Sequence, residues 1–515
     1  MRPFSDELQT LIMARYPLIW VQTYEETRLI AILSRIAAVR GKQLRAWTIT
    51  EGIHDPMKGH RADPTTTDPM FALEAVNEQQ TPTIYAFLDL HDHLTDPNTK
   101  DGSIIRKLRD LHDRLKSSNT SLILVSPKAE IPMELEKSIA LLSMPYPDET
   151  ELRDLFDRLY EDLKFRAQAE PAAERTLQVL EPAFRTNRDA LVQAGRGLTL
   201  DEYENVITKC KVEKNLTVEA ILTEKEQIIK KAGILEYFRT DQTLDDVGGL
   251  DNLKDWIRKA GKRYSKEAIA YGLEPPRGVL LTGPPGTGKS LSAKAIAQVL
   301  KVPLLRMDMS KIASQWYGKS TENIAKALKL AEAVAPCVLW TDEIEKMMAG
   351  EHEETARMLS VWLTHFEECD APILRLATSN RPMNLKPEFL QRFERSFFVD
   401  LPLPHERAEI FEIHLRKRKC DPARFDLPEL ARATDGFVGR EIVNLIKECL
   451  TTAFYEERPL TTDDLVREAE GTICTSKQKD ANIDALRAHV KDWAVPASKQ
   501  PNGANDGRRH VEYTE

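Results

Sequence analysis

The sequence of 515 residues has no apolar run that approaches the roughly 18 residues a membrane-spanning helix requires. It also lacks an excess of basic charge, because 72 Lys and Arg stand against 81 Asp and Glu, a formal charge of −9. Its six cysteines include no C-x-x-C pair. Asp6 and Glu7 precede only a short apolar segment, which is not typical of a secretory signal.

These absences narrow the class of protein. The acidic balance disfavours a sequence-independent nucleic-acid binder, which needs a basic stripe. The scattered cysteines are typical of reduced thiols in a cytoplasmic protein. We therefore expect no membrane partner, and a nucleic-acid partner is disfavoured. The length predicts about three or four domain-sized units.

A glycine-rich octapeptide, Gly-Pro-Pro-Gly-Thr-Gly-Lys-Ser at 283–290, fits the pattern G-x-x-x-x-G-K-[ST] between an apolar run and a helical stretch. Its glycines let backbone N–H groups turn toward phosphate oxygens, which the following helix also attracts. Lys289 is predicted to reach the β- and γ-phosphates of ATP, and the Ser290 hydroxyl to ligate Mg²⁺. The predicted nucleotide-binding residues here are Gly283, Pro284, Pro285, Gly286, Thr287, Gly288, Lys289, Ser290 and Leu291.

Two later strands end in polar residues that suit ATP hydrolysis. The apolar run from Val338 ends in Asp342 and Glu343. Asp342 is predicted to hold Mg²⁺, usually through a water, and Glu343 to polarise the attacking water. Asn380 follows another predicted strand, and its amide can orient that water; a turn asparagine is the alternative.

Three arginines are candidates for contacting the transferred phosphoryl group. Arg392 and Arg395, at i and i+3, are expected to share a helix face that cannot reach its own phosphate loop. Supplied by a neighbouring subunit, one of them could act as an arginine finger, whereas a solvated basic face is the alternative. Arg440 opens a later helix and could reach the γ-phosphate of its own nucleotide, or be an ordinary surface arginine.

The adjacent aromatics Trp316 and Tyr317 precede Gly318. Neighbouring side chains on a helix or strand point apart, so at most one of the two rings is expected in the core. Exposed for contact, an aromatic ring can grip a substrate by stacking and apolar contact. Core or interface packing is the alternative.

The chain shows the same element pattern twice, with apolar runs that alternate with helical stretches as in a parallel α/β sheet. Residues 148–235 and the region from Pro404 to about Gly471 are predicted to be helical, and residues 497–515 to be disordered. The first copy has no chemistry at the phosphate-loop position, since residues 24–28 offer two carboxylates and neither glycine nor lysine. After the acidic-strand residue Asp89, a catalytic version would have Glu at the position of Leu90. We expect the following strands, with a helix over Ile104–Leu115: Leu18–Thr23, Thr83–Leu90, Ser121–Val125, Gly278–Thr282, Leu304–Met307, Cys337–Thr341, Ile373–Thr378 and Ser396–Leu401.

Together these motifs resemble the AAA+ ATPases, in the branch that contains FtsH, the p97-type unfoldases and spastin. The resemblance covers about 245–470 and includes Asp246-Val-Gly-Gly-Leu250 and Gly436–Glu441. The whole chain resembles the hypothetical chloroplast open reading frame forty-six family. Ala14–Val21, Leu135–Lys137 and Lys231–Tyr237 carry that narrower likeness.

The resemblance implies a P-loop NTPase with a helical lid, a nucleotide contact at Gly248, assembly into a ring expected to be a hexamer, and a channel lined by Trp316 and Tyr317. Two departures stand out. The segment before Arg392 is two residues shorter than the family pattern, and many members of the branch carry Ala where this chain has Arg440. The implied domains are a degenerate α/β domain (1–147), a helical lid-like region and linker (148–240), the ATPase core (241–403), its lid (404–471), and a C-terminal helix with a disordered tail (472–515).

We therefore predict a Mg²⁺-dependent ATPase that assembles into a ring and remodels a protein partner, located in the cytoplasm or, if plastid-encoded, in the stroma. An ATP-gated switch or scaffold with little turnover is one alternative. A nucleic-acid remodelling ATPase is another, disfavoured by the acidic charge.

Overall fold

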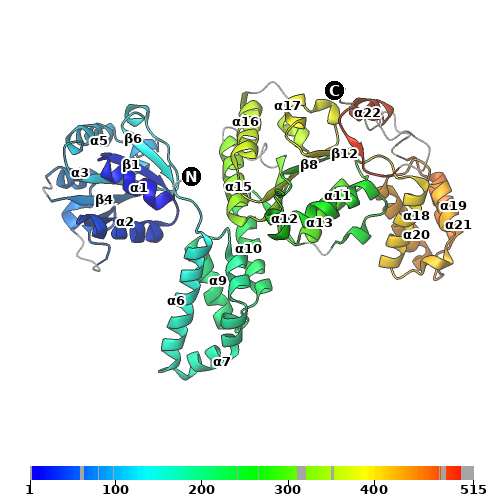
Figure 1. The fold of residues 1–515 in the computed structure, drawn as a ribbon, viewed down its shortest axis with the longest axis horizontal. Coiled ribbons are helices and arrows are strands. Elements are labelled where there is room, and N and C mark those ends of the chain that lie inside the picture. Colours follow the sequence, from blue (N-terminus) through cyan, green and yellow to red (C-terminus); the bar gives the residue numbers. More distant parts are fainter. Residues whose placement is uncertain are drawn as a thin grey trace. The chain divides into compact units, whose positions relative to one another are not determined.

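The computed structural model describes residues 3–57, 63–78, 81–96, 98–239, 242–264, 266–309, 320–348, 353–474, 476 and 483–499. The chain forms two compact units, an N-terminal unit (Met1–Thr217) and a C-terminal unit (Val218–Glu515), each with its own sheet (Figure 1).

The N-terminal unit is built on a six-stranded sheet in the order β3-β2-β4-β5-β1-β6. All neighbouring strands are parallel except the edge strand β3, which runs antiparallel to β2. Alternate strand residues face two separate cores. Ile19 and Val21 pack with α2, whereas Leu18 and Trp20 pack with α3 and α5. The strands are β1 (Leu18–Gln22), β2 (Gln43–Thr48), β3 (Gly52–His54), β4 (Thr83–Leu88), β5 (Ser121–Ser126) and β6 (Ile139–Ser143), with helices α1 (Phe4–Met13), α2 (Glu26–Arg40), α3 (Pro69–Glu78), α4 (Asp92–Thr95) and α5 (Gly102–Leu115).

A helical region follows this sheet, as predicted. Its helices begin at side-chain caps where the sequence provides them: Asp148 and Glu151 form a capping box on α6, and Thr199 and Glu202 form one on α9. The helices are α6 (Glu149–Ala167), α7 (Pro171–Thr186), α8 (Arg188–Gly195) and α9 (Leu200–Glu213), and α10 (Val218–Ala232) opens the C-terminal unit.

The C-terminal unit has a seven-stranded sheet in the order β13-β12-β8-β11-β10-β9-β7, again parallel except for the edge strand β7. Its central strands are buried along their length, as expected of strands covered on both faces. The strands are β7 (Glu236–Phe238), β8 (Gly278–Thr282), β9 (Leu304–Asp308), β10 (Cys337–Asp342), β11 (Ile373–Ser379), β12 (Arg395–Phe398) and β13 (Val495–Pro496), and the helices are α11 (Asp251–Lys262), α12 (Lys266–Ala270), α13 (Lys289–Leu300), α15 (Ser320–Val334), α16 (Glu353–Glu368) and α17 (Pro387–Leu390).

A helical lid follows, with its own core around Phe411, Leu430 and Ile446. It comprises α18 (Pro404–Lys417), α19 (Leu427–Ala433), α20 (Gly439–Tyr455) and α21 (Thr462–Gly471), and α22 (Ile483–Val490) comes after it.

The two sheets share one topology. The order β2-β4-β5-β1-β6 matches β9-β10-β11-β8-β12 strand for strand, and each sheet has an antiparallel strand on the same edge, β3 or β7. The predicted repeat of the fold is therefore confirmed.

The predicted start of the disordered tail at Ala497 is wrong. Ala497 is fully buried, its N–H donates to Phe398 O (2.9 Å), and its carbonyl accepts from Leu253 N (3.1 Å). The short strand β13 pairs beside it with β12. Apolar packing against α11 and the sheet holds Ala497 in place. The prediction failed there because it rested on the polar, glycine-containing composition of 497–515 as a whole.

Candidate nucleotide site

The predicted phosphate loop connects β8 to α13 as the six residues 283–288. Gly283, Gly286 and Gly288 have φ values of 146°, 84° and 100°, which favour glycine. A Cβ on Gly283 would lie 2.1 Å from Val399 O, and one on Gly286 would lie 2.9 Å from Val438 of the lid. The glycines of this loop are therefore required by its geometry.

Lys289 begins α13 and lies inside the loop with only 6% of its surface exposed. Its Nζ donates to Gly283 O (2.8 Å) and Pro284 O (2.7 Å). Burial lowers the pKa of Lys289 to about 8, although the charges of Glu345 and Asp342 oppose that shift. A buried ammonium held at a glycine-rich loop fits a phosphate group.

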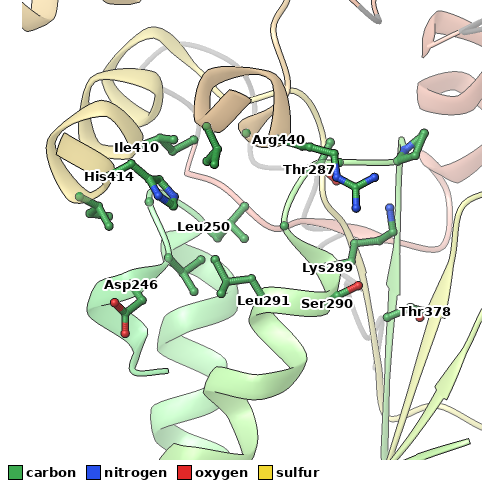
Figure 2. A pocket seen from close by; sticks show the side chains of 18 of the residues that line it. Asp246, Leu250, Thr287, Lys289, Ser290, Leu291, Thr378, Ile410, His414 and Arg440 are labelled. Carbon is green, nitrogen blue, oxygen red and sulfur yellow. The ribbon is translucent and has the colours of Figure 1, made fainter. Parts of the chain in front are cut away.

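A cavity of about 590 Å³ opens beside the loop. Figure 2 shows Lys289 and Arg440 at this cavity, the first from the start of α13 and the second from the lid. Of the predicted site residues, those that line the cavity are Gly248, Pro285, Gly286, Thr287, Gly288, Lys289, Ser290, Leu291, Asp342, Glu343, Asn380 and Arg440.

The acidic pair stands where β10 ends. Asp342 Oδ1 accepts from the Thr378 hydroxyl (2.6 Å), and its Oδ2 accepts from Arg306 (2.6 Å). Glu343 follows with a left-handed φ of 53° and forms an ion pair with Lys346. Together with the Ser290 hydroxyl at the same cavity, the Asp342 carboxylate supplies the oxygen ligands that Mg²⁺ prefers, so the donor set fits this ion.

The lid contacts the loop directly. Arg440 N donates to Gly286 O (3.1 Å) at the start of α20. On the other side of the cavity, Leu250 N donates to Glu406 (3.0 Å) and Gly249 N to Glu409 (2.8 Å), both on α18. Hydrogen bonds donated by backbone N–H groups therefore connect the lid to the phosphate loop and to the segment before α11.

The paired arginines do not lie on one helix face, so that prediction is wrong. Helix α17 ends at Leu390, and Arg395 is already the first residue of β12. Arg392 forms an ion pair with Glu367 of α16. Neither arginine lines the cavity of its own chain. Trp316 and Tyr317 lie outside the described residues.

Sequence reasoning missed the lid residues that close the cavity and two residues behind Asp342. The missed lid residues include Ile410, Ile413 and His414 of α18 and Val443, Asn444 and Lys447 of α20. Burial, together with Arg418 and Lys417, lowers the pKa of His414 to about 4, so its ring is neutral near pH 7. Strand pairing brings Thr378 and Arg306 to Asp342, and no local sequence motif predicts that contact.

At the corresponding position of the N-terminal unit, the loop between β1 and α2 has only the three residues 23–25. Glu25 is buried there, and it accepts from Leu200 N at the start of α9 (2.7 Å) and from Arg28 (2.8 Å). Arg28 also donates to both oxygens of Glu151 (2.9 and 2.6 Å). A carboxylate of the chain itself therefore lies where the other unit has its phosphate loop.

The predicted match between the acidic strands is wrong by one residue. Asp89, like Glu343, is the first residue after its strand and has a left-handed φ, 56° against 53°. Leu88 therefore stands where the C-terminal unit has Asp342. Among its described residues, the N-terminal unit therefore has no counterpart of Asp342, the predicted metal ligand, and its loop is shorter.

One further group of metal-ligand types occurs among the described residues. Glu332, His365 and Cys369 have ligand atoms within 4.8 Å of one another. Arg375, which has no acceptor, donates to His365 Nδ1 (3.4 Å) and to its carbonyl (3.2 Å). His365 Nε2 also lies 3.0 Å from Glu332, so both ring nitrogens already face protein groups, and we assign no metal here.

The parallel sheet, phosphate loop, acidic strand end and lid define a AAA-type ATPase domain, an ATP hydrolase. A family model described as "ATPase family associated with various cellular activities (AAA)" matches residues 279–401, and one described as an AAA+ lid domain matches 424–468. Models described as the N-terminal and second domains of SpoVK-like AAA ATPases match 4–144 and 150–232.

The chain is also similar to whole proteins. It is 33% identical over 503 residues, 95% of this chain and 98% of the relative, to the uncharacterized AAA domain-containing protein ycf46 of Pyropia yezoensis, and 32% identical to that of Guillardia theta over 95% of both chains. It matches the ATP-dependent zinc metalloprotease FtsH of Acidothermus cellulolyticus with 33% identity over 53% of this chain and 44% of the relative. The chain belongs to the SpoVK-like/ycf46 family of AAA ATPases, which confirms the resemblance seen in the sequence. None of the helices among the described residues is long and apolar enough to cross a bilayer.

Proposed function

We propose that the cavity binds Mg²⁺ and ATP, that it hydrolyses the nucleotide with help from a second copy of the chain, and that the resulting oligomer remodels a protein partner. One observation carries the proposal: groups suited to binding phosphate, holding a metal and activating water lie around one cavity, from α13, the ends of β10 and β11, and the lid. Membership of the AAA family suggests ATP binding and oligomerisation in general.

Each residue has a separate task. The loop N–H groups and Lys289 would hold the phosphates, and Ser290 and Asp342 would hold Mg²⁺, which would supply charge stabilisation during phosphoryl transfer. Glu343 accepts the proton of the attacking water, and Asn380 orients that water. Arg440 contacts the γ-phosphate from the lid, so that loss of this phosphate on hydrolysis changes the position of α20.

The oligomeric part of the proposal rests on Arg392 and Arg395. Both lie outside the cavity of their own chain, and Arg392 is about 41% exposed on its ion pair with Glu367. An arginine in that position can serve the cavity of a neighbouring copy. We favour Arg392 as the finger and a hexameric ring as the assembly.

Two variants test the site. Lys289→Ala should lose ATP binding, since it removes the main charge directed at the phosphates. Glu343→Gln should bind ATP normally and lose at least about a hundredfold in turnover, because an amide cannot take the proton. Calorimetry and a phosphate-release assay separate the two effects. Wild-type turnover in Glu343→Gln would exclude this site as the catalytic one.

A second candidate function is an ATP-gated switch with little turnover. It is favoured by the cations on both acidic residues, Arg306 on Asp342 and Lys346 on Glu343, which restrain the groups that hydrolysis needs. Turnover that rises when a protein substrate is added favours the remodelling function. Nucleotide-dependent partner binding with negligible turnover favours the switch.

A further inference from the structure

Arg306 occupies an unusual position between two carboxylates of different strands. Its Nη2 donates to Asp342 of β10 (2.6 Å), and its Nη1 donates to Glu236 of β7 (3.2 Å). The guanidinium lies 5.0 Å from the ring of Trp340, and the side chain is about three-quarters buried. One cation is therefore shared by the predicted metal-binding carboxylate and by an edge strand.

The strand pairing fixes this arrangement. Arg306 is opposite Glu236 in the antiparallel pair of β9 and β7, and opposite Trp340 in the parallel pair of β9 and β10. Thr378 holds the other oxygen of Asp342 and is itself bonded by Trp340 Nε1 (3.1 Å). Among the described residues, Asp342 therefore accepts from two side chains, and the charged one is Arg306.

Arg306 also has room to move. It lines a second cavity of about 570 Å³, separate from the nucleotide cavity, together with Glu236, Asp308 and Arg239. Asp308 lies 3.9 Å from the same Nη2 that contacts Asp342. The buried Nε of Arg306 has no hydrogen-bond partner among the described residues. The guanidinium is thus not saturated in its present position.

We propose that Arg306 is a positioning residue that determines how much Mg²⁺ the ATPase site needs in order to bind nucleotide. Glu236 of β7 modulates this effect through its contact with Arg306. The inference rests on the proposed function. A guanidinium on Asp342 reduces the negative potential that attracts a divalent cation. Glu236 draws the same guanidinium away, so an intact contact between β7 and β9 favours metal binding.

The position of β7 in the chain gives this contact its significance. β7 follows α10 directly near the start of the C-terminal unit and is the edge strand of its sheet, so only β9 pairs with it among the described strands. A partner or a movement that pulls β7 from β9 removes Glu236 from Arg306. The nucleotide site then requires more Mg²⁺, without any change in the residues that line it.

The test measures the Mg²⁺ concentration that half-saturates binding of a non-hydrolysable ATP analogue to the full chain, by calorimetry. Arg306→Met retains an apolar stem over Trp340 and should lower that concentration about tenfold. Glu236→Gln should raise it about threefold, since the charge that draws Arg306 away from Asp342 is then lost. The double variant should behave as Arg306→Met, because Glu236 acts only through Arg306.

Glu226→Gln is the matched control. Glu226 lines the same cavity but is paired with Arg239 (3.7 Å) rather than Arg306, so its loss should leave the Mg²⁺ requirement unchanged. A higher Mg²⁺ requirement in Arg306→Met, or a Glu236→Gln effect that persists without Arg306, overturns the inference. If the wild-type chain binds the analogue with no Mg²⁺ dependence, the proposed function falls and takes this inference with it. Mg²⁺-dependent binding that no variant alters overturns the inference alone.

Discussion

At the scale of single residues, the site depends on placing charge where water cannot reach it. Lys289 is an ammonium with little exposure, held by two loop carbonyls, and its burial lowers its pKa to about 8. A phosphate group offers this ammonium an anion in place of neutral oxygens. Nucleotide binding should therefore favour the protonated form of Lys289.

A pH dependence follows from this pKa. Above about pH 8 the free folded chain loses the Lys289 proton, so ATP affinity should fall as the pH rises and binding near pH 8.5 should take up a proton. Between about 8 and the ordinary value of 10.5 the unfolded chain binds more protons, so the same group makes the fold more stable as the pH rises. Calorimetry in buffers of different ionisation enthalpy measures the uptake. Lys294 lies on the same helix but contacts the ring of Phe238, so Lys294→Met should leave the proton uptake unchanged. If the wild-type chain takes up no proton on binding ATP, the assignment of Lys289 is contradicted.

At the scale of elements, the phosphate loop and the loop of the N-terminal unit occupy the same place in one sheet topology but differ in length and in what they contact. The six residues 283–288 leave space for a ligand, whereas the three residues 23–25 place Glu25 against the first turn of α9. Arg28 bridges Glu25 and Glu151 at the start of α6. The carboxylate joins the sheet of this unit to its helices.

Arg28→Met should therefore destabilise the N-terminal unit. It leaves Glu25 buried and without its cation, which typically costs about 3–5 kcal/mol. Chemical denaturation monitored by fluorescence and circular dichroism measures the loss. Arg153→Met is the control: Arg153 of α6 pairs with Glu149 in the first turn of the same helix, but it is about 31% exposed and its partners are exposed, so no comparable loss is expected. Equal effects of the two substitutions would contradict a specific role for the Glu25 contact.

The sequence predicts elements well where periodicity or a motif is local. The strand Gly278–Thr282 was predicted with the bounds that the structure has, since an apolar run meets a glycine loop there. β7 and β13, three and two residues long, were missed because their pairing partners define them rather than any pattern of their own. The helix predicted across Arg392 and Arg395 was wrong for a related reason, because pairing with β8 draws Arg395 into a strand.

The residues of the site likewise fall into two groups, those that a local motif predicts and those that it does not. The loop residues, Asp342, Glu343 and Asn380 follow from motifs in which a few neighbouring residues carry the chemistry. His414, Thr378 and Arg306 come to the same region from a lid helix and from neighbouring strands. Only tertiary structure brings such residues together, and nothing in their immediate sequence distinguishes them.

At the scale of the whole molecule, most residues proposed to bind ATP line the described cavity, whereas Arg392 and Arg395 do not. Arg392 follows the end of α17 and Arg395 begins β12, both outside the lining of the cavity. The central claim is therefore that an active site is shared between copies of the chain. Arg392→Ala alone should keep ATP affinity and lose hydrolysis, since the finger acts on the transition state and contributes about 10³-fold or more in related mechanisms.

The measurement that tests this claim most directly is the ATP turnover of a mixture of Arg392→Ala and Glu343→Gln chains. Each variant alone should be inactive. In the mixture, a site with an intact Glu343 can face a neighbour with an intact Arg392, so activity should return and should depend on the ratio of the two chains. A mixture as inactive as its components, or an Arg392→Ala chain that hydrolyses ATP at the wild-type rate as a monomer in light scattering, would contradict the shared site.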